Sequence, residues 1–127
     1  MIERKEDEIQ HLLKVNMKPI LPSLREKNRY IVFEVISKNK IKFDNVKKEI
    51  YTMENKMLGE IEMSNAGIMF LSDWSNQRGI IKVSNHYSDK IRIPFLFINK
   101  INNYDVIVQT RGISGILKKA RGRFLYN

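Results

Sequence analysis

The stretch "RYIVFEVIS", residues 29–37, decides the fold. Its β-branched and aromatic residues favour an extended strand. The apolar residues alternate between the two faces of that strand, three on each: Ile31, Phe33 and Val35 on one side, and Tyr30, Val32 and Ile36 on the other. Only Glu34 interrupts the pattern, so we expect a central strand of a sheet that is covered on both faces.

An amphipathic helix is expected next, over residues 43–58. Its apolar residues recur at helical spacing: Phe43, Val46, Ile50, Met53 and Met57. Asp44 is a residue type that caps the start of a helix, and Gly59 is a type that ends one. Two strands should follow, "GIMFLSDW" at 67–74 and "GIIKVSN" at 79–85. The short polar link "SNQR" between them is typical of an antiparallel hairpin.

A second helix is expected to begin at Ser88, although Pro94 lies inside it and predicts a kink or a late start. Its apolar face is formed by three residues: Ile91, Phe95 and Ile98. Residues 104–111, "YDVIVQTR", alternate as a fourth strand.

Ser114 is expected to cap a terminal helix. Its apolar residues recur every four positions: Ile116, Ala120 and Phe124. Its basic residues project elsewhere around it: Lys118, Lys119, Arg121 and Arg123.

The order of elements between the first and last helices is βαββαβ. This order predicts the α+β class and a ferredoxin-like or RRM-like sandwich with an antiparallel four-stranded sheet, plus additional N- and C-terminal helices. Residues 1–17 are expected to be an N-terminal extension, with Ile9, Leu12 and Leu13 at helical spacing. Residues 18–127 are expected to form one α/β domain, since 127 residues suit a single core.

Charge is distributed unevenly along the chain. The net charge is +9, and residues 1–62 hold 13 basic and 11 acidic side chains, whereas residues 63–127 hold 10 and 3. A basic half of this kind favours a polyanion as partner, because clustered cations release counterions from phosphates. Nucleic acid is the first expectation. An anionic membrane surface, an acidic protein and scattered solvated lysines remain open.

Composition excludes several other classes. The chain has no cysteine, which excludes disulfides, cysteine-ligated metal sites and thiol catalysis. No run approaches the roughly 20 apolar residues that cross a bilayer, so no membrane-spanning segment is expected, and apart from the charge-based alternative of an anionic surface no membrane partner is expected. The acidic start "MIERKEDEIQ" does not resemble a signal peptide, and we expect a cytoplasmic protein.

Two basic clusters are the candidate RNA-binding sites. No acid follows Asp105, while five basic residues do: Arg111, Lys118, Lys119, Arg121 and Arg123. "LREKNR", before the first strand, adds a second cluster: Arg25, Lys27 and Arg29. A solvated helix face is the alternative interpretation of the terminal cluster, but the lack of a nearby acid favours contact with RNA.

The stacking platform of an RNA-recognition domain is missing. "RGIIKVSN" has Ile80, Lys82 and Asn85 where aromatic residues would stack on bases, so RNA contact should go through phosphates and shape.

Further chemistry is sparse. "RGISG", residues 111–115, is either a phosphate-binding turn or a plain strand-to-helix turn capped by Ser114. His11 and His86 leave open a metal-free ribonuclease, whereas Asp73, Asp89 and Asp105 are too scattered to hold divalent ions.

Four segments together resemble the ribonuclease P protein component 2 family of archaeal and eukaryotic RNase P: "KPILPSLREKNRYIVFEVIS", "AGIMFLSDWSNQRGIIKVSNHY", "VIVQTRGISG" and "ILKKARGRFL". The likeness spans residues 18–125. The sequence departs from the family pattern in the acidic extension 1–17 and at Pro94, where the family has an uninterrupted helix.

The resemblance implies a protein subunit of the ribonucleoprotein that removes the 5′ leader from precursor tRNA. RNA is the catalyst in that family, Mg²⁺ is held by RNA phosphates, and the protein binds no cofactor of its own. The implied partners are RNase P RNA, component 3 in a heterotetramer, the other RNase P proteins, and precursor tRNA as substrate of the whole particle. The alternative is a protein-interaction adaptor of the same fold, in which the extension and the apolar side of the terminal helix bind a partner.

Overall fold

The computed structural model describes residues 27–126, so the expected extension 1–17 and Arg25 lie outside the described residues. The elements are β1 (Asn28–Ser37), α2 (Phe43–Ala66), β2 (Met69–Ser75), β3 (Arg78–Ser84), α3 (Ser88–Arg92), β4 (Lys100–Ile101), β5 (Tyr104–Ser114) and α4 (Leu117–Ala120). Two 3₁₀ turns, Asn85–Tyr87 and Pro94–Phe97, flank α3, and a π-helical turn, Arg121–Leu125, continues α4. No helix in this part of the chain is long and apolar enough to span a bilayer.

The sheet has the order β2-β3-β1-β5-β4, and all its strand pairs are antiparallel. Leaving aside the two-residue β4, this is the strand order of a ferredoxin-like fold, which confirms the predicted class. The short fifth strand is the one addition to the expected four. β1 lies at the centre, between β3 and β5, as its two apolar faces predicted.

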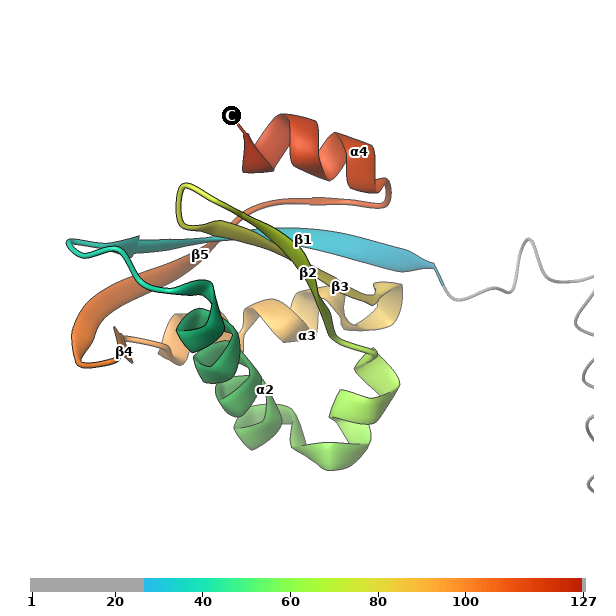
Figure 1. Cartoon of the computed structure of the whole chain (residues 1–127). Helices are drawn as coiled ribbons and strands as arrows, with labels where there is room; N and C mark the ends of the chain where they lie inside the picture. The colour runs from blue at the N-terminus through green and yellow to red at the C-terminus, as the bar shows by residue number, and fades with distance from the viewer. Residues whose placement is uncertain (1–26, 127) are drawn as a thin grey trace, which may run out of the picture.

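Helices cover the sheet on both sides. Figure 1 shows α2 and α3 below the sheet and α4 above it. The larger core lies on the side of α2, here called the inner face, and includes Ile31, Phe33 and Val35 of β1. A smaller core lies on the opposite, outer face, and includes Val32 of β1 and Ile80 of β3.

The expected hairpin forms between β2 and β3. Asn76 and Gln77 at its turn both have positive φ, 52° and 60°, as a two-residue turn of this type requires. Glutamine is unusual at a turn position with positive φ, and the hydrogen bonds of the Gln77 side-chain amide explain its presence there. Its Oε1 accepts from the Ile41 backbone N–H at 3.1 Å, and its Nε2 donates to the Ile41 carbonyl at 3.3 Å.

The helix after β1 differs from expectation in three ways. Lys42 is the N-cap residue and Asp44 makes no capping bond, so that assignment was wrong. Gly59 leaves helical geometry, at φ 82° and ψ 167°, but the helix resumes and ends at Gly67. Met57 is 42% exposed, whereas Glu54 is fully buried. Glu54 follows Val46 and Ile50 at intervals of four residues, so it lies on the same buried face of the helix.

The segment after β3 confirms the effect expected of Pro94. The helix breaks into α3 and the 3₁₀ turn Pro94–Phe97, while the three predicted apolar residues are all buried: Ile91, Phe95 and Ile98. Ser88 is the first residue of α3, not its cap, and its hydroxyl donates to the Asn85 carbonyl at 3.1 Å.

Candidate functional site

The segment Leu117–Leu125, here called the terminal helix, packs on the outer face of the sheet. Ala120 and Leu125 are fully buried there, and Leu117 and Phe124 are half-buried against Val32 and Ile80. Two sequence expectations were wrong. Ser114 belongs to β5 and does not cap α4, and Ile116 precedes α4 and is 52% exposed. The apolar side of the helix is therefore used within the fold, which removes half of the surface on which the adaptor hypothesis depended.

Gly112 allows the terminal helix to approach the sheet. A Cβ at this position would lie 2.3 Å from Phe124 Cε1, which is far inside contact distance. Arg78 fixes the same end of the helix, because its Nη1 donates to the Phe124 carbonyl at 3.3 Å. Gly112, one of the two glycines of "RGISG", thus serves packing, and the phosphate-binding interpretation of this turn loses that part of its support.

Gly112→Ala is expected to destabilise the fold by about 1–3 kcal/mol, because the added methyl group must displace the Phe124 ring. Urea unfolding measures the loss. Gly122→Ala is the matched control, since a Cβ at Gly122 meets nothing within 4 Å. Equal stability of both variants would show that the helix does not sit tightly on Gly112.

Arg121 is not a free cation. Its Nε and Nη2 donate to the two carboxylate oxygens of Asp73 at 2.8 and 3.0 Å. These hydrogen bonds raise the pKa of Arg121, and they anchor the terminal helix to β2. The expectation that the terminal cluster has no acid nearby was therefore wrong, because Asp73 lies 48 positions earlier in the chain.

A second polar network on the outer face surrounds Glu34. Arg78 Nε donates to this carboxylate at 2.7 Å, Gln109 Nε2 donates at 2.9 Å, and Arg111 Nη1 lies 3.9 Å away. Burial by itself would raise the pKa of Glu34, but the hydrogen bonds from Arg78 and Gln109 and the charges of Arg78 and Arg111 lower it overall. Arg111 is thus partly neutralised.

The other terminal cations are exposed and carry no ion pair among the described residues: Lys118, Lys119 and Arg123. Arg29 joins them in space, because its Nη1 would lie 2.9 Å from a Cβ at Gly115, just before α4. Lys27 is exposed at the entry to β1. The two basic clusters of the sequence therefore meet, and we call these five residues the basic face.

Lys82 is a candidate that sequence reasoning missed. It pairs with Tyr30 across β1 and β3 and is partly exposed on the outer face. Its position between the buried Ile81 and Val83 of the opposite face was the available signal. Residues 117–125 carry no acid, whereas five acids lie on the inner side of the sheet, on α2: Asp44, Glu49, Glu54, Glu60 and Glu62.

The outer face of the sheet is closed to stacked bases where the terminal helix covers it. Ile80, at the position of a platform aromatic, is fully buried under that helix. His86 is exposed in the 3₁₀ turn Asn85–Tyr87. Among residues 27–126, no group of three histidine or acidic residues lies close enough to hold a metal ion.

The sequence is similar to proteins of known families. A sequence model of the Rpp14/Pop5 family matches residues 29–125. Ribonuclease P protein component 2 of Thermococcus kodakarensis is 34% identical over 105 residues, which cover 82% of this chain and 88% of that protein. The protein of the same name from Methanosarcina mazei is 33% identical over 109 residues, which cover 86% and 93%.

A chain in the cryo-EM structure of yeast Ribonuclease MRP has the same fold. The TM-score is 0.59 at 12% sequence identity, and the match covers 73% of this chain and 77% of that chain. The family model spans nearly all the residues that the structure describes, and the chain therefore belongs to the Rpp14/Pop5 family.

Proposed function

We propose that this chain is a protein subunit of the RNase P ribonucleoprotein, the particle that removes the 5′ leader from precursor tRNA. Its relatives at 30–34% identity carry the name Ribonuclease P protein component 2. Its task in the particle is to bind and stabilise the catalytic RNA through the basic face.

The observation that carries this proposal is the separation of free from paired cations. Arg78 and Arg121 hold carboxylates and so build the fold, whereas Lys118, Lys119 and Arg123 are left exposed on a helix without an acid. Cations placed in this way neutralise the repulsion between phosphates when RNA strands pack together. Mg²⁺ belongs on the RNA phosphates in this scheme, and the protein itself carries no cofactor.

The subunit is proposed to be non-catalytic by itself. Two acids of the outer face, Glu34 and Asp73, are both bonded to arginines, which leaves neither positioned as a general base. The purified chain should leave precursor tRNA intact, and cleavage should appear only with the RNA. Cleavage by the protein alone that His86→Ala removes would establish the rival ribonuclease mechanism.

Component 3 of RNase P is the proposed protein partner, in a heterotetramer. This assignment rests on the resemblance to the component 2 family. Sedimentation equilibrium of the mixed recombinant proteins tests it directly, with a four-chain mass expected.

The affinity for RNA should depend strongly on salt. If the basic face contacts about five phosphates, the logarithm of the affinity falls against the logarithm of salt concentration with a slope of roughly −3 to −5. Filter binding of the chain to RNase P RNA over roughly 50 to 300 mM salt gives the slope, because phosphate contacts respond to ionic strength in this range. A slope near zero would contradict phosphate contact.

A further inference from the structure

Strand β5 has an open edge along most of its length. β1 pairs with one side of β5 from Val106 to Ser114. On the other side, β4 pairs only with Tyr104 and Asp105, and Val106 N–H donates to the Asn99 carbonyl at 3.0 Å. Beyond Val106, no other strand of the described chain lies beside β5.

Within residues 27–126 nothing pairs with the backbone groups at this edge, and these groups are regularly spaced. Val35 N–H donates to Gln77 at 2.8 Å, so the polar backbone atoms of Val35 point to β3. Its partner on β5, Val108, must then direct its N–H and carbonyl away from β1, because antiparallel pairs alternate in this respect. The same holds for Thr110, the partner of Phe33. The edge therefore offers two donors and two acceptors at the spacing of a further strand.

Exposed apolar side chains flank the edge on its helical side. A groove of about 550 Å³ lies between β5 and the segment from α3 to the 3₁₀ turn, lined by Ile93, Phe95, Leu96, Ile107 and Val108 among others. Leu96 is 80% exposed and Ile93 is 49% exposed. Phe97, next to them in the chain, is 59% exposed.

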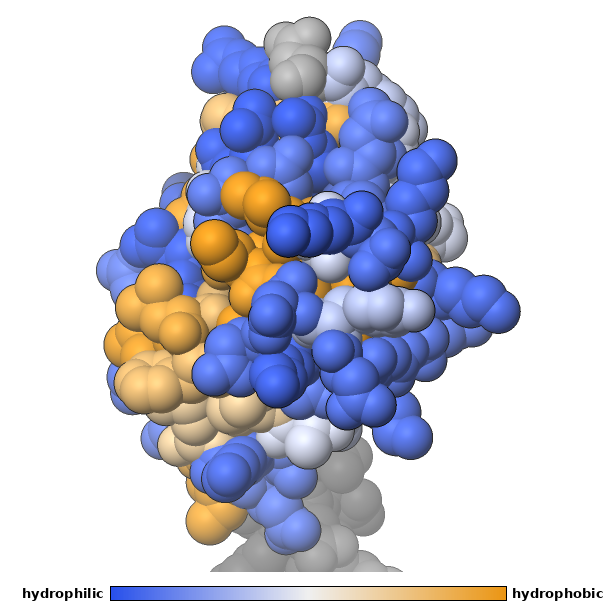
Figure 2. Space-filling model, turned by 90° about the vertical axis from the view of Figure 1, so that its left-hand side faces the viewer, coloured by the Kyte–Doolittle hydropathy of each residue, from blue (hydrophilic) through white to orange (hydrophobic). Residues whose placement is uncertain are grey.

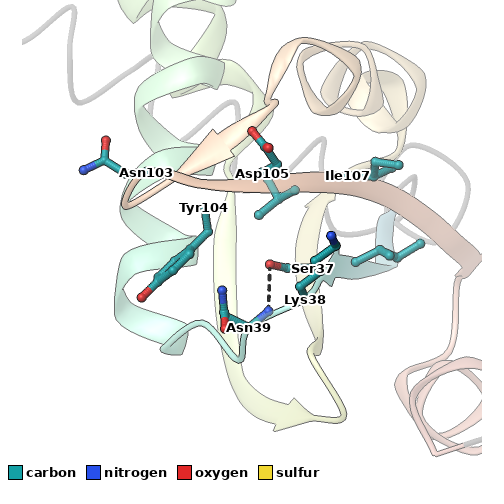
Figure 3. Close-up of a pocket in the computed structure, with 9 residues that line it drawn as sticks. Ser37, Lys38, Asn39, Asn103, Tyr104, Asp105 and Ile107 are labelled. Carbon is teal, nitrogen blue, oxygen red and sulfur yellow. Dashed lines mark hydrogen bonds between the residues drawn. The ribbon is translucent and has the colours of Figure 1, made fainter.

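The outer face continues this apolar surface. A hollow of about 560 Å³ near the end of β1 is lined by Ile36, Tyr104 and Ile107, with Ser37, Lys38 and Asn39 beside them (Figure 3). Ile107 is 62% exposed and lines both the groove and the hollow. Figure 2 shows this end of the molecule, where apolar residues gather in one patch with hydrophilic residues around it.

We propose that an extended segment of another protein subunit pairs with the open edge of β5 and continues the sheet. Its backbone would bond to Val108 and Thr110, and alternate apolar side chains would fall into the groove and the hollow, as in other cases of strand addition. The inference goes beyond RNA binding, and it rests on the proposed function only in assuming that other protein subunits share the particle.

The charges at the edge favour an apolar protein segment over RNA. The two charged groups in the groove, Asp89 and Arg92, already pair with each other, and Arg111 lies close to Glu34. Asp105 and Lys38 are both exposed beside the hollow and carry opposite charges, so the hollow has no excess of positive charge. Natural proteins usually protect an open edge with lysine or proline, but β5 has "VIVQT" at residues 106–110. An edge of this kind requires a cover.

The test is amide hydrogen exchange at single residues, with the full chain and each other recombinant subunit added in turn. Exchange at Val108 and Thr110 should slow by roughly tenfold or more with one of these subunits. Exchange at Ile107 and Gln109 should hardly change, since their amides already face β1. This alternation distinguishes a paired strand from a merely covered surface.

The variant Leu96→Lys/Ile107→Lys should lose the protection, because both side chains are exposed in the free chain and a charge would be buried on docking. Met57→Lys/Ile61→Lys on α2 makes the same chemical change at exposed positions and should keep it. Both variants should bind RNase P RNA as the unmodified chain does, which separates failure here from failure of the basic face.

Four outcomes would overturn the proposal. Protection that depends only on the concentration of the chain itself would indicate a second copy as the occupant. Protection that depends on RNA alone would indicate a nucleic-acid contact. Protection that survives in Leu96→Lys/Ile107→Lys places the docking site elsewhere. Unchanged exchange with every subunit shows that the edge stays open.

Discussion

The triple variant Lys118→Glu/Lys119→Glu/Arg123→Glu is expected to lose RNA affinity by on the order of a hundredfold or more at moderate salt. Each substitution removes one phosphate contact and adds a charge that phosphates repel. The salt slope should also become shallower by about three, one for each lost contact. Filter binding to RNase P RNA across a salt series measures both effects.

Arg121 is spared in this variant because of its role in the fold. A glutamate at that position would face Asp73, the partner to which Arg121 donates at 2.8 and 3.0 Å. Reversal of Arg121 would therefore detach the terminal helix and confuse loss of structure with loss of RNA contact. The three substituted residues are exposed, so the variant should keep the stability of the unmodified chain.

The matched control changes charge by the same amount on the opposite side of the sheet. Lys42, Lys48 and Lys56 are exposed at the start of α2 and along it, and their reversal should lower affinity far less. Equal losses in the two variants would show that only net charge matters, and the basic face would then have no special role.

The free energy of unfolding should fall as pH rises from about 5 to about 8, because Glu54 stays protonated inside the folded protein while it ionises in the unfolded chain. Glu54 is fully buried on α2, and its carboxylate oxygens have no hydrogen-bond partner among residues 27–126. Burial raises its pKa from 4.5 to about 8. Between these values the folded chain keeps a proton that the unfolded chain releases, so stability decreases with pH, by about 3 kcal/mol over the whole interval.

Glu54→Leu should remove this decline and leave the chain more stable at pH 8, since leucine fills a similar volume without a charge. Glu60→Gln, at an exposed position of the same helix, should keep the decline. Urea unfolding at about pH 5, 6, 7 and 8 gives the free energy of unfolding as a function of pH. A decline of the same size in Glu54→Leu would refute the assignment.

Glu34 acts in the opposite direction and at lower pH. Its pKa is below 4.5 in the folded chain, so the stability it contributes is present above that value and is lost as pH falls through the lowered pKa. The two glutamates therefore titrate in separate intervals, and the change between pH 5 and 8 reports on Glu54.

The sequence predicted the sheet well because its signals are local. The alternation in residues 29–37 identified the central strand and its two faces, and the turn at residues 76–77 followed from its polar link. Pro94 predicted the broken helix because a proline in the interior of a helix disrupts that helix. Caps were predicted less well: Asp44, Ser88 and Ser114 have capping side chains, but none of them caps the helix to which it was assigned.

The candidate site was only half predictable. The basic residues of the terminal helix and their amphipathic placement were visible as a pattern, but their pairing was not. The apolar pattern predicted Met57 as a buried residue, but Glu54, which follows Val46 and Ile50 at intervals of four residues, is buried instead. The spacing of apolar residues gives no signal for a buried acid. The free-energy cost of burying the acid is offset by packing elsewhere in the domain.

The sequence by itself determined the order and type of the elements, the basic character of the carboxyl-terminal half and the family, since each of these depends on residue types and short spacings. Tertiary structure alone decided which cations are free, because Arg121 meets Asp73 only when residues 48 positions apart pack together. It likewise brought Arg29 to the terminal helix and left one edge of β5 open. Ion pairs and strand edges depend on the distances between elements, and a linear pattern carries no information about those distances.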